Sequence, residues 1–423
     1  MVNLCDFRRE TITLQEYIPK ERRRQYYQLH FSVPENVCRI DIEYFYDRRG
    51  NIIDLALLDY AGNYVGSSGS DKRHISISGW VSTPGYSRVE TKAGEWAVII
   101  GAYQVQDIGV NVTYRVTFTY RQRTLLKGDT HVHTTASDGS LETGSVVSAA
   151  RKSGLDYIFI TDHNNYSQNY MLPMESDITV LPGMEWTHYD GHAGLLGVQR
   201  PINNAFCINH EKEAWELLDQ ARQNGAIVVL NHPFCPACGW HFGMERDGYD
   251  MIELINGGLE YSANRKCLMW WHQKLCEGKR IPVLGGSDFH RSDGMHCIGR
   301  PQTCIYAFSP SPDDIIGALR NGNSYVVTQE DAPSLWVESS GKILGEKVSC
   351  GDNVEIRFRE LLKGDMLRLV TDRSVEEIDC KENRSSMDLQ RIYPEEKFVR
   401  FEVVRDGKEI LISNPLYFEQ NKK

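Results

Sequence analysis

Long apolar segments are missing from this chain of 423 residues. No run approaches the 18 or so consecutive apolar residues that a membrane-spanning helix needs, so we expect no membrane insertion. The first ten residues, MVNLCDFRRE, lack the apolar centre of a secretion signal. The expected location is therefore the cytoplasm.

An excess of positive charge is missing as well. The 47 lysine and arginine residues are outnumbered by 57 aspartate and glutamate residues, which gives a formal net charge of -10. Binding to duplex DNA or RNA requires the neutralisation of many phosphates, so no duplex nucleic acid is expected as a partner. A small anionic substrate stays compatible with this charge, because bound metal ions invert the charge of a site locally.

Cysteine is too sparse for a disulfide-rich protein. The 11 cysteines are an odd number spread along a large chain, which fits reduced thiols better than a disulfide framework. Cys235 and Cys238 with His241 resemble half of a zinc site, but structural zinc ions usually have four ligands and no second pair lies nearby. We interpret this segment as a loop that covers the rim of an active site.

The two ends of the chain have the pattern of half-buried strands. Apolar and polar residues alternate in 38–44 and in 114–120, so we interpret residues 1–124 as an antiparallel β-sandwich. Residues 329–423 repeat the alternation and carry a hairpin signal at Asp406–Gly407, which predicts a small C-terminal β-domain.

The middle of the chain, residues 125–328, has continuous apolar runs separated by helical patterns. Such runs are typical of parallel strands that are buried on both faces. Because the chain is also too long for one ordinary domain, the sequence predicts a multidomain α/β protein. The runs lie in 155–161, 179–181, 227–230 and 281–287, and the helices are expected over 142–153, around 214–221 and after the cap residue Ser311.

The segment DTHVHTTASDG at 129–139 is the most informative one. His131 and His133 are separated by one residue, so on a strand they would share a face and could bind the same metal ion through neutral ring nitrogens. Asp138 can reach back from the following loop. A single His-x-His is weak evidence, because any exposed strand can carry two histidines.

Further candidate ligands follow the later apolar runs. In barrel-like α/β folds the reactive residues gather at the carboxyl ends of the strands. We therefore expect these side chains to meet at one metal centre. In chain order they are His163 after 155–161, Glu185 and His192 after 179–181, His232 after 227–230, and Asp288 and His290 after 281–287.

Taken together, the segments DTHVHTTASDG, ITDHN, GME followed by GH, NHP and GSDFH resemble the PHP (polymerase and histidinol phosphatase) superfamily. Within it they look most like the CehA/McbA-type metallohydrolases. The resemblance covers the middle half of the chain. It implies a distorted seven-stranded (β/α) barrel with two or three divalent metal ions at the carboxyl ends of the strands. The N-terminal sandwich resembles the jelly-roll-like domain that precedes this barrel in some relatives.

The resemblance also implies how the ligands divide among the ions. Many relatives have histidine at the position of Asp138, so the third ion is where this chain departs from the family pattern. His192 is preferred over the neighbouring His188, because His192 belongs to the GH motif. The implied sets are His131, His133, Glu185 and Asp288 for one ion, Glu185, His192 and His232 for a second, and Asp138, His163 and His290 for a third.

These donor types predict hydrolytic chemistry. Nitrogen and carboxylate ligands suit Zn, Mn or Fe(II) and do not choose among them. Two ions roughly 3.5 to 4 Å apart can hold a bridging hydroxide that attacks a phosphoester. The leaving alkoxide then needs a proton or a metal ion. His290, Asp138 and Asp162 are the catalytic candidates for this role, and the sequence does not rank them.

Other residues beside the motifs have supporting interpretations. Asp129 and Asp162 precede ligand histidines and are expected to accept hydrogen bonds that fix imidazoles, with Asn231 acting similarly. Arg291 and Arg300 are the candidate substrate-binding residues, and the alternative is that they, like Lys127, are solvated surface charges. The other histidines are interpreted as core or surface residues, namely His30, His74, His210, His272 and His296.

Two classes of function remain open. The first is a metal-dependent hydrolase, with a small phosphomonoester or phosphodiester as the favoured substrate and a carbamate or carboxylic ester as the alternative. The second is a carbohydrate-binding or peptide-binding protein whose barrel is not catalytic. A scaffold would not need a complete set of ligands, and the sequence contains a complete set. The oligomeric state cannot be inferred from the sequence.

Overall fold

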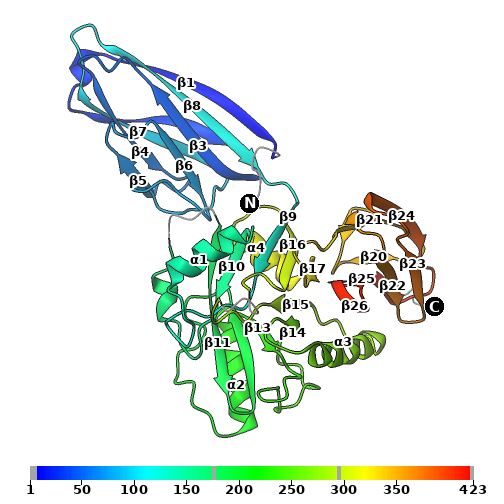
Figure 1. The fold of residues 1–423 in the computed structure, drawn as a ribbon. Helices are drawn as coiled ribbons and strands as arrows, with labels where there is room; N and C mark the ends of the chain where they lie inside the picture. The colour runs from blue at the N-terminus through cyan, green and yellow to red at the C-terminus, as the bar shows by residue number, and fades with distance from the viewer. Residues whose placement is uncertain (1–6, 174–177, 293–296, 420–423) are drawn as a thin grey trace.

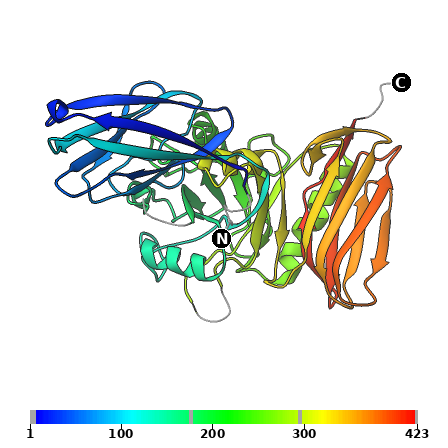
Figure 2. The same ribbon diagram turned by 90° about the horizontal axis from the view of Figure 1, so that it is seen from above.

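The protein is multidomain and rich in β-structure (Figure 1). The computed structural model describes residues 7–173, 178–292 and 297–419, so His296 lies outside the described residues. The sheets of the N-terminal and C-terminal regions lie on opposite sides of the central region in Figure 2. None of the helices in the described ranges is long and apolar enough to cross a membrane.

The region predicted to be an antiparallel β-sandwich contains two four-stranded sheets with antiparallel pairing. Trp96 from one sheet and Tyr114 from the other are buried in a shared apolar cluster. The alternation read from 38–44 and 114–120 falls on β3 and β8, which pair with each other. The first sheet is β1 (Arg9–Ile18), β8 (Val110–Tyr120), β3 (Val37–Phe45) and β6 (His74–Ser78), and the second is β2 (Tyr26–Val33), β7 (Gly94–Gln104), β4 (Ile52–Leu58) and β5 (Tyr64–Ser68).

The central region is built on a series of strands, each of which is hydrogen-bonded to the next. β9, β10 and β11 run parallel, and so do β13, β14 and β15. The order along the sheet is β15 (Val283–Gly286), β14 (Met251–Asn256), β13 (Ile227–Asn231), β12 (Gly191–Leu196), β11 (Thr179–His188), β10 (Tyr157–Ile160), β9 (Thr124–Asp129), β16 (Gln302–Ala307) and β17 (Ser324–Val327).

The parallel pattern is interrupted at β12, which the sequence did not predict as a strand. β12 pairs antiparallel with both β11 and β13. β11 extends to His188 at the Tyr189–Asp190 turn and β12 returns from Gly191, so His192 lies near the start of β12 rather than in a loop. This hairpin brings His192 opposite Thr187 on β11 and Asn231 on β13.

The predicted helices form, and each covers the sheet with its apolar residues. Ser311 caps its helix by accepting a hydrogen bond from the Asp314 backbone N–H, and Pro312 is the first helical residue. The α-helices of the described residues are α1 (Thr143–Lys152), α2 (Glu211–Gln223), α3 (Tyr261–Cys276) and α4 (Pro312–Arg320), and the short 3-10 turns are η2 (Lys20–Arg22) and η3 (Ser167–Tyr170).

The C-terminal strands continue the central sheet. β17 pairs antiparallel with β26, and the ladder then runs to β25, β22 and β23. The predicted Asp406–Gly407 hairpin joins β25 to β26, with positive φ at both residues as its tight turn requires. The strands on this side are β20 (Lys347–Ser349), β22 (Met366–Thr371), β23 (Val375–Asp379), β25 (Phe398–Arg405), β26 (Lys408–Ser413) and β27 (Leu416–Glu419).

A separate sheet packs against these strands. Phe358 of this sheet and Phe401 of β25 are fully buried in one apolar cluster. Its order is β19 (Lys342–Ile343), β18 (Ser334–Ser339), β21 (Asn353–Leu361) and β24 (Arg384–Ile392).

Candidate metal centre

The carboxyl ends of the parallel strands bring the predicted ligands together. The segment after β9 carries His131 and His133, and Val132 between them bridges to Phe289 in the segment after β15. His163 after β10 bridges to Glu185 on β11. These backbone pairings place residues that are far apart in the sequence around one point.

That point is the carboxylate of Glu185. It is fully buried, and five imidazoles surround it. Asn231 donates a hydrogen bond to Oε1 of Glu185 from its side-chain amide, at 2.8 Å. The nitrogen-to-oxygen distances are 3.3 Å for His131 Nε2, 3.5 Å for His133 Nε2, 2.9 Å for His163 Nδ1, 3.3 Å for His192 Nδ1 and 3.2 Å for His232 Nε2.

Asp288 faces His131 and His133 of the segment DTHVHTTASDG. Its Oδ1 lies 3.3 Å from His131 Nε2 and 3.1 Å from His133 Nε2. The backbone of Asp288 has a φ of 53°, an uncommon conformation for a residue with a side chain. Such backbone strain is found at functional sites, where the surrounding structure enforces it.

A second group lies on the more exposed side of the cluster. Asp138 Oδ1 is 3.2 Å from His290 Nε2 and 3.6 Å from His163 Nε2. The Asp138 side chain is 59% exposed, whereas the Glu185 side chain is 0% exposed. The group around Asp138 is therefore the part of the cluster that a molecule from solvent can reach.

Charge pairing dominates the electrostatics of the cluster. Burial would raise the pKa of the Glu185 carboxyl, but the facing imidazoles, His131 first, hold it well below its usual range. Burial would likewise raise the pKa of Asp288, but His131 and His133 lower it. Both carboxyl groups are therefore anionic at neutral pH and are strong candidate metal ligands.

Several buried atoms of the cluster lack a hydrogen-bond partner among the described residues. They are Nε2 of His131, both ring nitrogens of His133 and Oε2 of Glu185. Buried polar atoms are rarely left unsatisfied, and an ion is one partner that can satisfy them. Nitrogen and carboxylate donors also match borderline divalent ions. The donor set therefore fits a metal centre.

Five overlapping groups of side chains in the described ranges have ligand atoms close enough to share an ion. All nine predicted ligands belong to at least one group, and Cys238 is an additional member. The groups are His131 with His133 and Asp288, His131 with Glu185 and His232, His163 with Glu185 and His192, His192 with His232 and Cys238, and His133 with Asp138, His163 and His290.

Glu253 is the residue of the centre that the sequence analysis missed. It lies on β14 and is buried, and its Oε1 is 2.9 Å from Nδ1 of His131. Its Oε2 accepts hydrogen bonds from the His232 backbone N–H and the Asn256 amide. No motif marks Glu253; the signal was a single acidic residue inside the apolar run Met251–Asn256.

Asp129 and Asp162 were predicted to accept hydrogen bonds from imidazole rings, and the structure gives their carboxylates other donors. Asp129 accepts hydrogen bonds from the backbone N–H groups of His131, Ser287 and Gly299. Asp162 accepts three hydrogen bonds, two from Thr134 and one from the Ser137 hydroxyl. Both carboxylates therefore hold the segments that carry the ligands, through backbone N–H and hydroxyl groups.

The remaining sequence candidates lie at the edge of the centre or away from it. His188 packs on Trp186, with ring centroids 5.9 Å apart, and is not in any of the five groups.

Arg291 directly follows His290 and is exposed. Arg300 is paired with Glu330 through Nε at 3.1 Å, and it lines a cavity of about 300 Å³ that Asn256 also lines. His241 is exposed and outside the five groups, so it does not complete a zinc site with Cys235 and Cys238 among the described residues.

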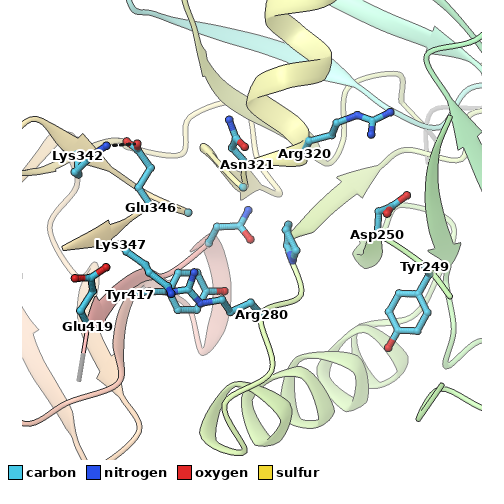
Figure 3. Close-up of a pocket in the computed structure, with 14 residues that line it drawn as sticks. Tyr249, Asp250, Arg280, Arg320, Asn321, Lys342, Glu346, Lys347, Tyr417 and Glu419 are labelled. Atoms are coloured by element: carbon cyan, nitrogen blue, oxygen red, sulfur yellow. Dashed lines mark hydrogen bonds and ion pairs between the residues drawn. The ribbon is translucent and has the colours of Figure 1, made fainter. Parts of the chain in front are cut away.

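A cavity of about 820 Å³ lies at the other ends of the same strands (Figure 3). Asp250 precedes β14 and Pro282 precedes β15, so this cavity borders the starts of strands whose carboxyl ends border the cluster. Arg280, Arg320 and Lys347 are among the residues that line it, and no predicted ligand does. The cavity is thus separate from the candidate metal centre.

One solved structure and two curated proteins resemble parts of this chain. A two-domain protein of Bacteroides vulgatus, which contains a predicted PHP-like metal-dependent phosphoesterase, is 19% identical, with a TM-score of 0.40 over 70% of this chain and 96% of that one. The chain resembles PHP-like metal-dependent phosphoesterases. The finer resemblance to the CehA/McbA type stays a prediction.

Two curated relatives match parts of the chain. The DNA polymerase/3'-5' exonuclease PolX of Bacillus subtilis is 23% identical over an alignment of 195 residues, and the match covers 39% of this chain and 34% of the relative. The match thus spans about a third of the length of that relative. An uncharacterised protein of Methanocaldococcus jannaschii is 24% identical over 149 residues, 31% of this chain and 82% of that protein. No family model matches the chain.

Proposed function

We propose that this protein is a metal-dependent hydrolase that cleaves a small phosphomonoester or phosphodiester. The observation that carries the proposal is the buried carboxylate of Glu185 with five imidazoles within 3.5 Å. Divalent ions would satisfy the buried ring nitrogens and the carboxylate oxygen of this cluster that have no hydrogen-bond partner among the described residues. The PHP-like resemblance supports the same reaction class.

We propose that the ligands divide among the ions as the family resemblance implies. His131, His133, Glu185 and Asp288 hold one ion, Glu185 also serves a second with His192 and His232, and Asp138, His163 and His290 hold a third. When bound, zinc, manganese or iron supplies a hydroxide nucleophile near neutral pH and neutralises the charge that develops on the phosphoryl oxygens. We further propose a distorted seven-stranded barrel within residues 125–328, with 1–124 and 329–423 as the two flanking domains.

The protein's own residues prepare this site in three ways. Glu253 holds His131 through Nδ1, which leaves Nε2 directed at Glu185 and Asp288. Asp129 and Asp162 fix the backbone of the first motif. Asp138 and His290, on the exposed side, lie where the leaving alkoxide would receive a proton or meet the third ion. Arg291, next to His290, is the candidate cation for an anionic substrate.

The test is metal analysis of the purified protein followed by assays on phosphomonoesters, cyclic and linear phosphodiesters, carbamates and aryl esters. We expect metal-dependent turnover of a phosphoester. Glu185→Gln and His131→Ala should lose more than the roughly 10- to 100-fold in metal affinity that removal of an outer partner causes. His30→Ala is the matched control, because His30 is exposed in the N-terminal sheets. Full activity in both ligand variants would refute the proposal.

A further inference from the structure

Cys235 and Cys238 lie beside a proposed metal ligand. The sulfur of Cys238 is 2.8 Å from the sulfur of Cys235 and 3.7 Å from Nδ1 of His232. On its other side, the His232 ring presents Nε2 to Glu185 at 3.2 Å. The Cys238 thiol therefore contacts Nδ1 of His232, and Nε2 of the same ring faces the metal centre.

The loop holds the two thiols together through its backbone. The Cys235 N–H donates to the His232 carbonyl at 2.8 Å, and the Gly239 N–H donates to the Cys235 carbonyl at 3.0 Å. A Cβ atom on Gly239 would lie 2.6 Å from that same carbonyl oxygen, so only glycine fits the turn. The thiol pair is thus preorganised by the chain itself.

The pair is also accessible, unlike many of the other thiols. Cys235 and Cys238 are partly exposed, and Pro236 and Ala237 between them are exposed. By contrast, the thiols that are buried cannot meet a dissolved oxidant, and these are Cys38, Cys267, Cys304 and Cys380. Exposure and a neighbouring resolving thiol are the two features that favour reversible oxidation.

We propose that Cys235 and Cys238 form a redox modification site for low-molecular-weight disulfides, and that its oxidation weakens metal binding by His232. The inference rests on the proposed metal centre. The sulfur of one cysteine, having lost its proton, attacks the small disulfide and releases one small thiol. The second cysteine then attacks the mixed disulfide and releases the other thiol, so that two protein S–H bonds are replaced by one S–S bond.

The link to the metal passes through His232. A histidine that binds a metal through one nitrogen donates the N–H of its other nitrogen to an acceptor, which fixes the ring and raises its basicity. Here the atom beside that other nitrogen is the sulfur of Cys238, 3.7 Å away, and it would accept the N–H when Nε2 binds a metal. Disulfide formation draws this sulfur toward Cys235, because a disulfide needs an S–S distance of about 2.05 Å. The His232 N–H then loses its acceptor.

The experiment uses the full chain equilibrated with mixtures of oxidised and reduced glutathione. Peptide mapping after alkylation identifies the disulfide, and competition with a chromophoric chelator measures zinc affinity on the same samples. We expect a Cys235–Cys238 disulfide and a zinc affinity about 10-fold or more below that of the reduced protein, since outer partners are worth roughly 10- to 100-fold. Excess reduced glutathione should restore the affinity.

Three variants sharpen the test. In Cys235→Ser, glutathione should remain attached to Cys238, because no second thiol releases it. In Cys238→Ser, zinc affinity should no longer respond to oxidised glutathione. Cys207→Ser removes an exposed thiol elsewhere and should respond like the unaltered protein.

The inference is overturned if the disulfide does not form in the folded protein, or if it forms and zinc affinity stays the same. A protein that binds zinc with this response but hydrolyses no phosphoester would contradict the proposed function alone. A protein that binds no metal would contradict both.

Discussion

The Nδ1 atom of His131 lies 2.9 Å from Oε1 of Glu253, and both side chains are buried. The opposite nitrogen of the ring is 3.3 Å from both Glu185 and Asp288. Carboxylate–histidine pairs of this kind orient metal-binding imidazoles. Glu253 therefore determines which nitrogen of His131 faces the centre.

Replacing Glu253 should weaken metal binding without removing a ligand. We expect Glu253→Gln to lower metal affinity by roughly 10- to 100-fold, because the amide is a weaker acceptor for the imidazole N–H. Chelator competition measures the change. Glu355→Gln, at an exposed position of β21, is the control and should match the unaltered protein. Equal affinities in the two variants would show that Glu253 does not orient His131.

Removing the metal should destabilise the fold. A ligand that binds only the native state at 100 times its Kd adds about 2.7 kcal/mol of stability. We therefore expect a chelator to lower the Tm of the metal-loaded protein in a calorimetric scan. The Tm of Glu185→Gln should be insensitive to the chelator. A chelator-independent Tm for the unaltered, metal-loaded protein would argue against ions within the cluster.

Asp138 should matter most for substrates with poor leaving groups. If Asp138 and His290 protonate the leaving alkoxide, Asp138→Asn should lower kcat for an alkyl phosphate by about 100-fold or more. A nitrophenyl phosphate should be affected far less, because its leaving group needs no proton. Asp190→Asn, an exposed acidic residue of the β11–β12 turn, serves as control. Equal losses on both substrates would assign Asp138 to metal binding alone.

Acid should destabilise the N-terminal sheets through Asp41. Burial favours the neutral acid, but hydrogen bonds from His74, Arg39 and Ser76 lower the pKa of Asp41 from 3.8 to about 2. The stabilisation is therefore complete above about pH 4 and is lost as the pH falls toward 2. It amounts to about 2 kcal/mol. Thermal scans between pH 2 and 5 should show a smaller pH dependence for Asp41→Asn than for the unaltered protein.

The sequence predicted most of the ligands because each follows a recognisable apolar run. His131, His163, His232 and Asp288 come after strands whose direction is fixed by parallel pairing, so their convergence followed from strand ends alone. The alternation in 38–44, the helix cap at Ser311 and the hairpin turn at Asp406–Gly407 were equally local signals. Such features depend on a few neighbouring residues, so they can be recognised without knowledge of the fold.

What escaped prediction depends on contacts between distant segments. β12 is antiparallel, and its placement follows from pairing with both β11 and β13, which no local pattern records. Glu253 is one acidic residue in a buried strand, and its role appears only when β14 lies next to the first motif. Asp129 and Asp162 were assigned to rings because of sequence adjacency, yet their carboxylates point to backbone N–H groups.

Asn414, just after β26, accepts a hydrogen bond from the Val283 N–H at the start of β15 and donates one back to the Val283 carbonyl. β15 leads directly to Asp288, and β26 pairs with β17. The strand that delivers Asp288 is therefore held on two sides, by its pairing with β14 and by the side chain of Asn414. A residue of the C-terminal strands thus supports the strand that carries one of the proposed metal ligands, although that residue is no ligand itself.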